Sequence, residues 1–357
     1  MQQIDRFRSL DGFSRTPFFM RLFFRAAAGV AAMVGLILPL AFPVFGAEEV
    51  VVYSARNEQL IKPLFDAYTK ETGVRVKFIT DKEGPLLERL KAEGDRTPAD
   101  LLITVDAGNL WRAAKEGLLK PVTSTILTEN IPAHLRDPEG RWFGLSVRAR
   151  TIVYNTKKVK PSDLSTYEDL GNPKWKKRLC LRTSKKVYNQ SLVAMMIEEH
   201  GEQKTEEIIR SWVANLATAP FADDVQVMEA VAARQCDVGV VNTYYFGRLK
   251  AKKPDLPIAL FWPNQSGRGV HVNISGAGVT IHAKREAEAV KLLEWLSSEK
   301  AQNLFADVDL EYPANPKVEP DSRIAAWGSF KQNVINVSRA GELQGAAIKL
   351  MDRAGYK

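Results

Sequence analysis

Residues 50–79, VVVYSARNEQLIKPLFDAYTKETGVRVKFI, place a strand, a helix and a second strand in immediate succession. The run at 50–53 is β-branched, apolar residues recur at helical spacing through 58–71, and 74–79 alternates as a strand does. Two strands joined by a helix form a βαβ unit. We therefore expect buried parallel strands covered by helices.

The same alternation continues outward along the chain. Because no repeat or low-complexity linker interrupts it, we expect two α/β lobes joined by strands, with a hinged cleft between them. Ligands bind such folds between the lobes, at the carboxyl ends of strands. Further strands are expected at 101–105, 142–147, 150–154, 178–182, 237–241 and 274–281, and helices at 85–93, 108–116, 189–200, 205–215, 225–234, 285–298, 300–306 and after Gly341.

The composition is that of a folded protein. The chain has 357 residues, 26% of them charged and 45% hydrophobic, which excludes disordered, collagen-like and small disulfide-rich classes. Its net charge of +8 favours anionic ligands only weakly, and no zinc-finger spacing or aromatic RNA-binding signature supports nucleic-acid binding. The sequence also contains no Gly-x-Ser-x-Gly elbow, P-loop or His-Glu-x-x-His motif, so an enzyme is disfavoured.

The N-terminal 47 residues are typical of an export signal. An uncharged apolar run at 26–47 follows Arg21 and Arg25, contains two prolines and ends in small residues. This pattern favours a cleaved signal peptide, residues 1–47, over an uncleaved anchor, and the basic segment after Met20 favours Met20 as the start of translation. Cys180 and Cys236 can pair in an exported chain, but their spacing alone does not establish the bond.

The paired tyrosines Tyr244 and Tyr245 follow the strand expected at 237–241. We expect them at the start of a helix, with Asn242 or Thr243 as the N-cap. Adjacent helical side chains diverge by about 100°, so both phenols can address one site. The positive helix end and a bound cation favour phenolate, a hard donor suited to ferric iron. On the dipeptide alone, packing against a lobe surface is the simpler explanation.

Seven motifs in order carry a more specific signal. They are YSARNE at 53–58, TPADLL at 97–102, RARTIVYN at 148–155, PKWK at 173–176, YNQSL at 188–192, NTYY at 242–245 and EYP at 311–313. Together they resemble the periplasmic ferric-iron-binding proteins of ABC importers, the bacterial counterparts of transferrin, from about Val50 to the C-terminus. The segment GRGVHVNISG at 267–276 is similar to the tyrosine-rich cyanobacterial branch of that family.

The resemblance implies a fold and a function. The fold is the two-lobe α/β architecture of type II periplasmic binding proteins, whose lobes close on the ligand like a Venus flytrap. The function is high-affinity capture of Fe(III) in the periplasm and its delivery, by a monomer, to an inner-membrane ABC permease. We place the N-terminal lobe at 48–149 plus 273–312 and the C-terminal lobe at 150–272 plus 313–357.

The resemblance also implies ligands, where residues match. Tyr244 and Tyr245 match the paired tyrosine ligands of the family, and Tyr154 matches a third tyrosine of the tyrosine-rich branch. The first loop departs from the pattern. Relatives place His, or His followed by Tyr, where this chain has Asn57 and Glu58, so the usual N-lobe ligands are absent.

Further oxygen donors must therefore complete an octahedral ferric site. The family position occupied by a carboxylate in some members falls on Val105, with Asp106 next to it. Our hypothesis is that Glu58 supplies one donor, or that a carbonate-type anion held by Arg56, Arg150 or Arg248 does so. Asn57, Asp106 and Asn242 complete the set of expected cleft residues.

Two other functions stay open at this point. One is a binding protein of the same fold for a small organic anion such as a phosphonate, and the other is an exported hydrolase. Arg148 and Arg150 alternate on a strand and can cradle an anion, although solvated arginines explain them equally well. His271 is best explained as a hydrogen-bonded structural histidine.

Overall fold

The βαβ unit at the start of the sheet is formed by β1 (Glu49–Ser54), α1 (Glu58–Thr72) and β2 (Arg75–Thr80), with β1 and β2 parallel. Ile61, Leu64, Phe65 and Tyr68 form the buried face of α1, as their spacing predicts. This computed structural model describes residues 49–357, so the expected signal peptide lies outside the described residues. Across 49–357, no helix is long and apolar enough to cross a membrane.

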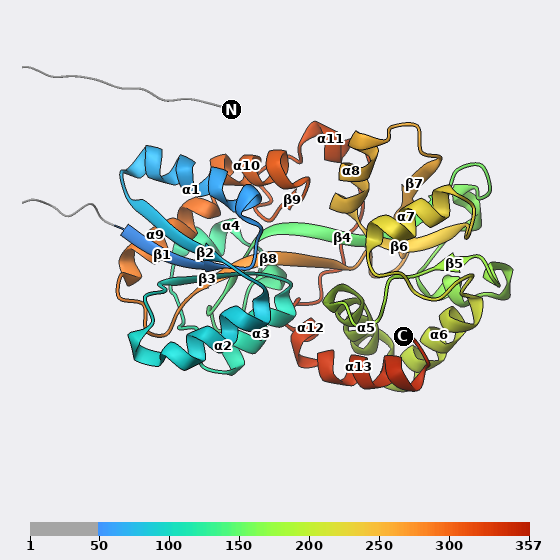
Figure 1. The fold of residues 1–357 in the computed structure, drawn as a ribbon, viewed down its shortest axis with the longest axis horizontal. Coiled ribbons are helices and arrows are strands. Elements are labelled where there is room, and N and C mark those ends of the chain that lie inside the picture. Colours follow the sequence, from blue (N-terminus) through green and yellow to red (C-terminus); the bar gives the residue numbers. More distant parts are fainter. Residues whose placement is uncertain (1–48) are drawn as a thin grey trace, which may run out of the picture. The chain divides into compact units, whose positions relative to one another are not determined.

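The strands form a mixed sheet in the order β2-β1-β3-β8-β4-β6-β5. β3 (Leu101–Val105) is parallel to β1, but β8 (Val272–Val279) enters antiparallel to β3, so the expectation of parallel strands is correct only in part. β4 (Phe143–Asn155) runs through the middle of the molecule, from one half to the other (Figure 1). The remaining strands are β5 (Leu179–Cys180), β6 (Val238–Asn242), β7 (Ile258–Phe261) and β9 (Tyr312–Pro313).

The strand β4 joins the two halves of the sheet, the first formed by β1, β2, β3 and β8 and the second by β5, β6 and β7. Its residues 143–149 pair with β8, and its residues 150–154 pair with β6, antiparallel in both cases. The sequence predicts two strands here, at 142–147 and 150–154. They form one continuous strand because Arg148 and Ala149, between them, also pair with β8. The buried Arg148 and Arg150 lie 3.7 and 3.2 Å from the carboxylates of Asp106 and Asp224.

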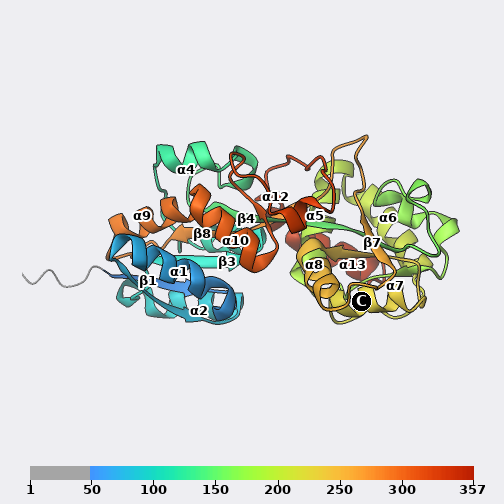
Figure 2. The same ribbon diagram turned by 90° about the horizontal axis from the view of Figure 1, so that it is seen from above.

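Helices cover both faces of the sheet. In the first half, α1, α9 and α10 lie on one face and α2 and α3 on the other (Figure 1). Figure 2 shows α1, α2, α9 and α10 gathered at one end and α6, α7, α8 and α13 at the other. The helices not yet given are α2 (Glu83–Glu93), α3 (Ala107–Lys115), α4 (Thr125–Asn130), α5 (Val187–His200), α6 (Glu202–Asn215), α7 (Asp224–Ala232), α8 (Thr243–Lys252), α9 (Glu286–Leu296), α10 (Glu299–Asp309), α11 (Ser322–Ala325), α12 (Arg339–Glu342) and α13 (Gln344–Arg353).

The apolar interior is divided at the middle of β4. Ala149 is the last β4 residue of one hydrophobic cluster, which also contains the β1, β3 and β8 side chains. Ile152 and Val153 belong to two further clusters in the second half. Cys180 and Cys236 form a disulfide there, with their Cα atoms 5.9 Å apart, so the pairing that the sequence left open is made.

Candidate metal centre

Three tyrosines from two helices converge on one cavity. Tyr244 and Tyr245 begin α8 directly after β6, and their ring centroids lie 4.3 Å apart. Tyr188 stands in the first turn of α5, and its hydroxyl accepts a hydrogen bond of 3.2 Å from the Tyr244 hydroxyl. All three line a cavity of about 450 Å³. A residue outside the predicted ligand set therefore joins the predicted tyrosine pair.

Asn242 positions the tyrosine pair. It occupies the N-cap position of α8, as expected, but its side chain does not cap the helix. Instead, its Oδ1 accepts a hydrogen bond of 3.0 Å from Arg150, and its Nδ2 lies 3.5 Å from the Tyr244 hydroxyl. Asn242 is buried and is absent from the cavity lining. Its place in the site is thus behind Tyr244.

Cationic side chains surround the phenols. Arg148, Arg182 and Lys186 lie over the Tyr188 ring at 5.4, 5.5 and 4.8 Å, and the Arg248 guanidinium lies 5.1 Å from the centre of the Tyr244 ring. Such contacts are attractive because the face of an aromatic ring is negative. Positive charge at this distance also favours the phenolate form once a bound cation displaces the phenol proton.

Burial keeps two of the phenols protonated before any cation binds. It raises the pKa of Tyr188 to about 12, although Arg148 opposes the shift. Burial also raises the pKa of Tyr244 well above its usual 10, and the neighbouring Tyr188 adds to the rise. A cation that binds these oxygens as phenolates must therefore release their protons.

Arg56 enters the same cavity from the other half of the sheet. It is buried, and its guanidinium lies 2.6 Å from the Asp309 carboxylate and 3.1 Å from that of Glu311. Burial raises the pKa of Asp309 to about 6. Burial alone would raise the pKa of Glu311 as well, but Arg56 and Arg148 hold it below its usual value. The charge of Arg56 is thus already balanced by protein carboxylates.

Glu311 is a cavity residue that the sequence did not assign. It lines the cavity and also accepts a hydrogen bond from the Ser146 hydroxyl. The signal for it was present in the Glu-Tyr-Pro motif, but its role depends on the return of the chain through β8 and α10 into the first half. Local sequence does not determine that path.

Residues of the first loop reach the cavity. Asn57 and Glu58 lie at the start of α1, are exposed and line the cavity together with Val105. Arg248 also lines it, and its Nη2 donates a hydrogen bond of 3.3 Å to the Asp309 carbonyl. The structure therefore brings Asn57, Glu58 and Arg248 to the tyrosine pair.

The structure does not bring Tyr154 to the cavity, and this corrects the expected ligand set. Tyr154 lies within β4, paired with Val238 on one side and Ala259 on the other. Its ring belongs to an apolar cluster of the second half, and burial raises the pKa of its phenol. A ring fixed in that cluster cannot serve a ligand in the cavity, whereas Tyr188 can.

Asp106 and Arg150 are likewise internal and not part of the cavity lining. The Asp106 carboxylate is fully buried and accepts hydrogen bonds from the Gly108 backbone, the Ser191 hydroxyl and the Asn273 amide at 2.9 to 3.0 Å. Arg150 contacts Asp224 at 3.2 Å. Because these groups are satisfied within the protein, we withdraw the expected place of Asp106 in the cleft and the expected role of Arg150 in anion binding.

The architecture defines a class: two α/β halves share a strand and enclose a polar cavity to which both contribute, as in binding proteins that hold a solute between lobes. The family described as bacterial extracellular solute-binding protein matches residues 96–330, and the chain belongs to this family. The predicted two-lobe α/β fold is confirmed. The chain is a solute-binding protein and not an enzyme, which removes the hydrolase alternative.

Known relatives agree with the motifs found in the sequence. Iron uptake protein A1 of Synechocystis sp. is 42% identical over 316 residues, covering 87% of this chain and 88% of the relative. Iron uptake protein A2 of the same organism is 38% identical, covering 94% of this chain and 98% of the relative. The solved structure of Trichodesmium IdiA (FutA), in complex with iron and citrate ligands, is 46% identical. It superposes with a TM-score of 0.84 and covers 87% of this chain and 100% of its own.

Proposed function

We propose that this protein captures Fe(III) in the cavity and holds it with the phenolates of Tyr188, Tyr244 and Tyr245. The observation that carries the proposal is the convergence of three phenols from α5 and α8 on one cavity. Phenolate is a hard oxygen donor, and three of them balance the charge of a 3+ ion. The relatives named for iron uptake and the iron-bound structure support the same cargo.

We further propose that an exogenous anion completes the coordination shell. An octahedral Fe(III) ion needs six donor atoms. The three phenolates supply three of them, and Glu58, an anion or water supplies the remaining three. Lys186 and Arg248 line the cavity, and no carboxylate of the described residues lies closer than 3.5 Å to either of them, so they are better placed to hold the anion than Arg56 or Arg150. A carbonate or a small carboxylate fits this charge pattern, and the Trichodesmium relative was solved with citrate.

The two lobes are proposed to close around the ion. We assign residues 48–149 plus 273–312 to the N-terminal lobe and 150–272 plus 313–357 to the C-terminal lobe. The separate hydrophobic clusters on either side of Ala149 and Ile152 support the boundary within β4. Ala314, Ile324 and Val337 pack in the first cluster, so the segment after Tyr312 returns to the second lobe later than residue 313. The phenols then belong to the C-terminal lobe, while Arg56 and Glu311 belong to the N-terminal lobe. Small-angle scattering should show a smaller radius of gyration with Fe(III) than without it.

The setting of this function is also a proposal. We propose that residues 1–47 are cleaved as a signal peptide, and that the mature monomer works in the periplasm and delivers Fe(III) to an inner-membrane ABC permease. A relative from Serratia marcescens is named as a periplasmic Fe(3+)-binding protein, which supports this location. Mass spectrometry of the exported protein and its cofractionation with the periplasm would test the assignment.

Absorption spectroscopy tests the cargo and the ligand set together. Ferric citrate added to the purified protein should produce a tyrosinate-to-iron charge-transfer band in the visible range. The band should weaken in each of Tyr188→Phe, Tyr244→Phe and Tyr245→Phe and persist in the matched control Tyr154→Phe. Repeating the titration with ferric chloride at low concentration, with and without bicarbonate, would show whether an anion is needed. A colourless protein would contradict the proposal and favour an organic anion as cargo.

A further inference from the structure

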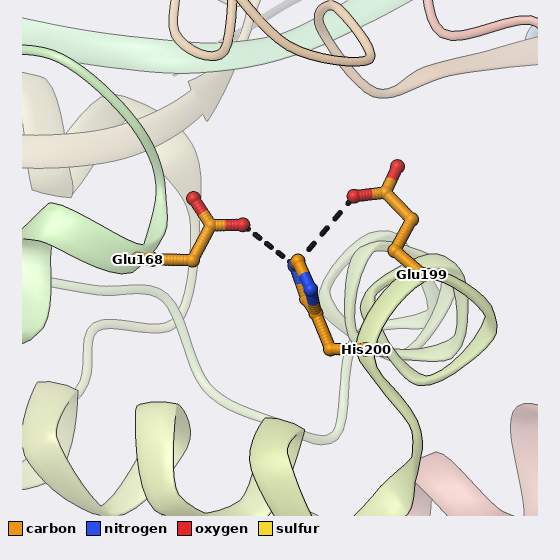
Figure 3. Close-up of side chains that lie close together, drawn as sticks. All are labelled: Glu168, Glu199 and His200. Carbon is orange, nitrogen blue, oxygen red and sulfur yellow. Dashed lines mark hydrogen bonds and ion pairs between the residues drawn. The ribbon is translucent and has the colours of Figure 1, made fainter.

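A second group of metal-ligating side chains lies outside the tyrosine cavity, where the 3-10 helix η4 (Glu168–Gly171) meets the end of α5. The His200 Nε2 atom is 2.8 Å from a Glu168 carboxylate oxygen and 3.6 Å from a Glu199 oxygen. Figure 3 shows both carboxylates directed at this nitrogen from different sides. The possible ligand atoms of the three residues all lie within 4.8 Å of one another.

Each carboxylate is held from behind by an asparagine amide. Asn264 Nδ2 lies 3.3 and 3.1 Å from the two Glu168 oxygens, while its Oδ1 accepts a hydrogen bond of 3.0 Å from the Tyr167 backbone. Asn333 Nδ2 donates a hydrogen bond to one oxygen of the Glu199 carboxylate. These amide contacts position the carboxylates before any ion binds, which is how outer partners orient metal ligands.

The two carboxylates of the cluster favour the binding of a cation. Two carboxylates face one imidazole nitrogen, which carries at most one proton and therefore donates to only one of them. A divalent ion at the imidazole nitrogen would balance both carboxylates at once.

We propose that Glu168, Glu199 and His200 bind a divalent transition-metal ion, with Zn²⁺ as the best match. Imidazole nitrogen and carboxylate oxygen are both ordinary zinc ligands, and a site with three protein ligands leaves a fourth position for water. The donor set differs from the three phenolates of the cavity. All three residues remain partly exposed, so the ion can enter from solvent. Binding would link η4 to the end of α5.

Calorimetry with ZnCl₂ tests the proposal. The protein is purified without an affinity tag after expression of the full-length chain, and it carries Tyr244→Phe and Tyr245→Phe so that the tyrosine cavity does not compete. We expect one Zn²⁺ per chain. Adding His200→Gln or Glu199→Gln should weaken binding by at least about tenfold, as should Asn264→Ala through the loss of its support to Glu168. The matched control His282→Gln, at an exposed histidine elsewhere, should bind Zn²⁺ as the parent does.

Two results would overturn the proposal. One is no Zn²⁺ uptake by the parent up to millimolar concentration, which would leave the three residues as an ion-paired cluster. The other is uptake with unchanged affinity in the His200→Gln variant. A thermal shift on Zn²⁺ addition provides a second measurement, because a ligand that binds only the folded state raises the melting temperature. Neither result bears on Fe(III) capture, because the tyrosine cavity is disabled in this parent.

Discussion

Replacing Tyr188 by phenylalanine should change the number of protons released when Fe(III) binds. Burial raises the pKa of Tyr188 to about 12, so removing its proton at pH 7 costs ~7 kcal/mol, which the iron must offset. Tyr244 is shifted in the same direction. The wild-type protein should therefore release at least two protons from these two phenols, and Tyr188→Phe should release one fewer. The affinity of Tyr188→Phe for Fe(III) should therefore depend less steeply on pH than that of the wild type, by a factor of about ten for each pH unit.

The measurement is proton release in weakly buffered solution at pH 7, followed with an indicator dye while ferric nitrilotriacetate is added. Protons from the donor complex cancel in the difference between wild type and variant, provided that both proteins are saturated. Tyr154→Phe is the matched control, since its phenol is also buried but lies outside the cavity, and it should release as many protons as the wild type. Equal release by Tyr188→Phe and wild type would refute the assignment of Tyr188 as a phenolate ligand.

Three further predictions concern stability. Arg150→Ala should lower the free energy of unfolding, measured in urea, by ~3 kcal/mol or more, because it leaves the buried Asp224 carboxylate without its closest cation. A loss below ~1 kcal/mol would show that the ion pair is dispensable. Removing the disulfide with Cys180→Ala and Cys236→Ala should cost ~4 kcal/mol from the chain entropy of a 56-residue separation, and an unchanged urea midpoint would contradict this. Burial lowers the pKa of His271 to about 3, while the ordinary value is 6.5, so the unfolded chain binds a proton first as the pH falls. Stability should drop by ~2 kcal/mol between pH 6.5 and 5, and His271→Asn should remove that part of the pH dependence.

The sequence predicts most elements because their patterns are local. The apolar spacing of α1, the alternation of β2 and the strand before Tyr244 all appear in the structure close to their expected bounds. The cavity also lies where such folds place it, directly after the carboxyl ends of β1, β3 and β6. These features depend on short segments whose side chains face one core.

The third tyrosine could not be located in this way. Tyr154 and Tyr188 both stand in recognisable motifs, and which one reaches Tyr244 depends on how α5 packs against the second half of the sheet. Arg148, Arg150 and Tyr154 alternate onto one face of β4, and every residue of this strand is buried, so the alternation alone does not exclude Tyr154 from a polar site. The sequence does not reveal the contribution of Glu311 either, because Glu311 contacts Arg56 across a sequence separation of 255 residues.

Asp106 shows how a residue expected in the cleft can support the site indirectly. Its backbone φ of 81° is unusual for a residue other than glycine, and its carboxylate, at the turn from β3 to α3, accepts both contacts of the Ser191 hydroxyl. Ser191 follows Tyr188 by three residues on α5, so the two side chains lie on neighbouring turns of one helix face. The position of Tyr188 is thus tied to the first half of the sheet.

This contact also constrains how the lobes can move. A rigid rotation about β4 either keeps Asp106 against Ser191 or separates them, and separation would leave a fully buried carboxylate with fewer donors. Gly108 and Asn273 would still donate to it, so the loss is that of one hydrogen bond to a charged group, ~1.5 to 3 kcal/mol. Closure that preserves the contact avoids this cost. We therefore expect the lobes to pivot at the β3–α3 turn, with α5 as part of the hinge, so that Tyr188 stays in place while Arg56 and Glu58 approach Tyr244 and Tyr245.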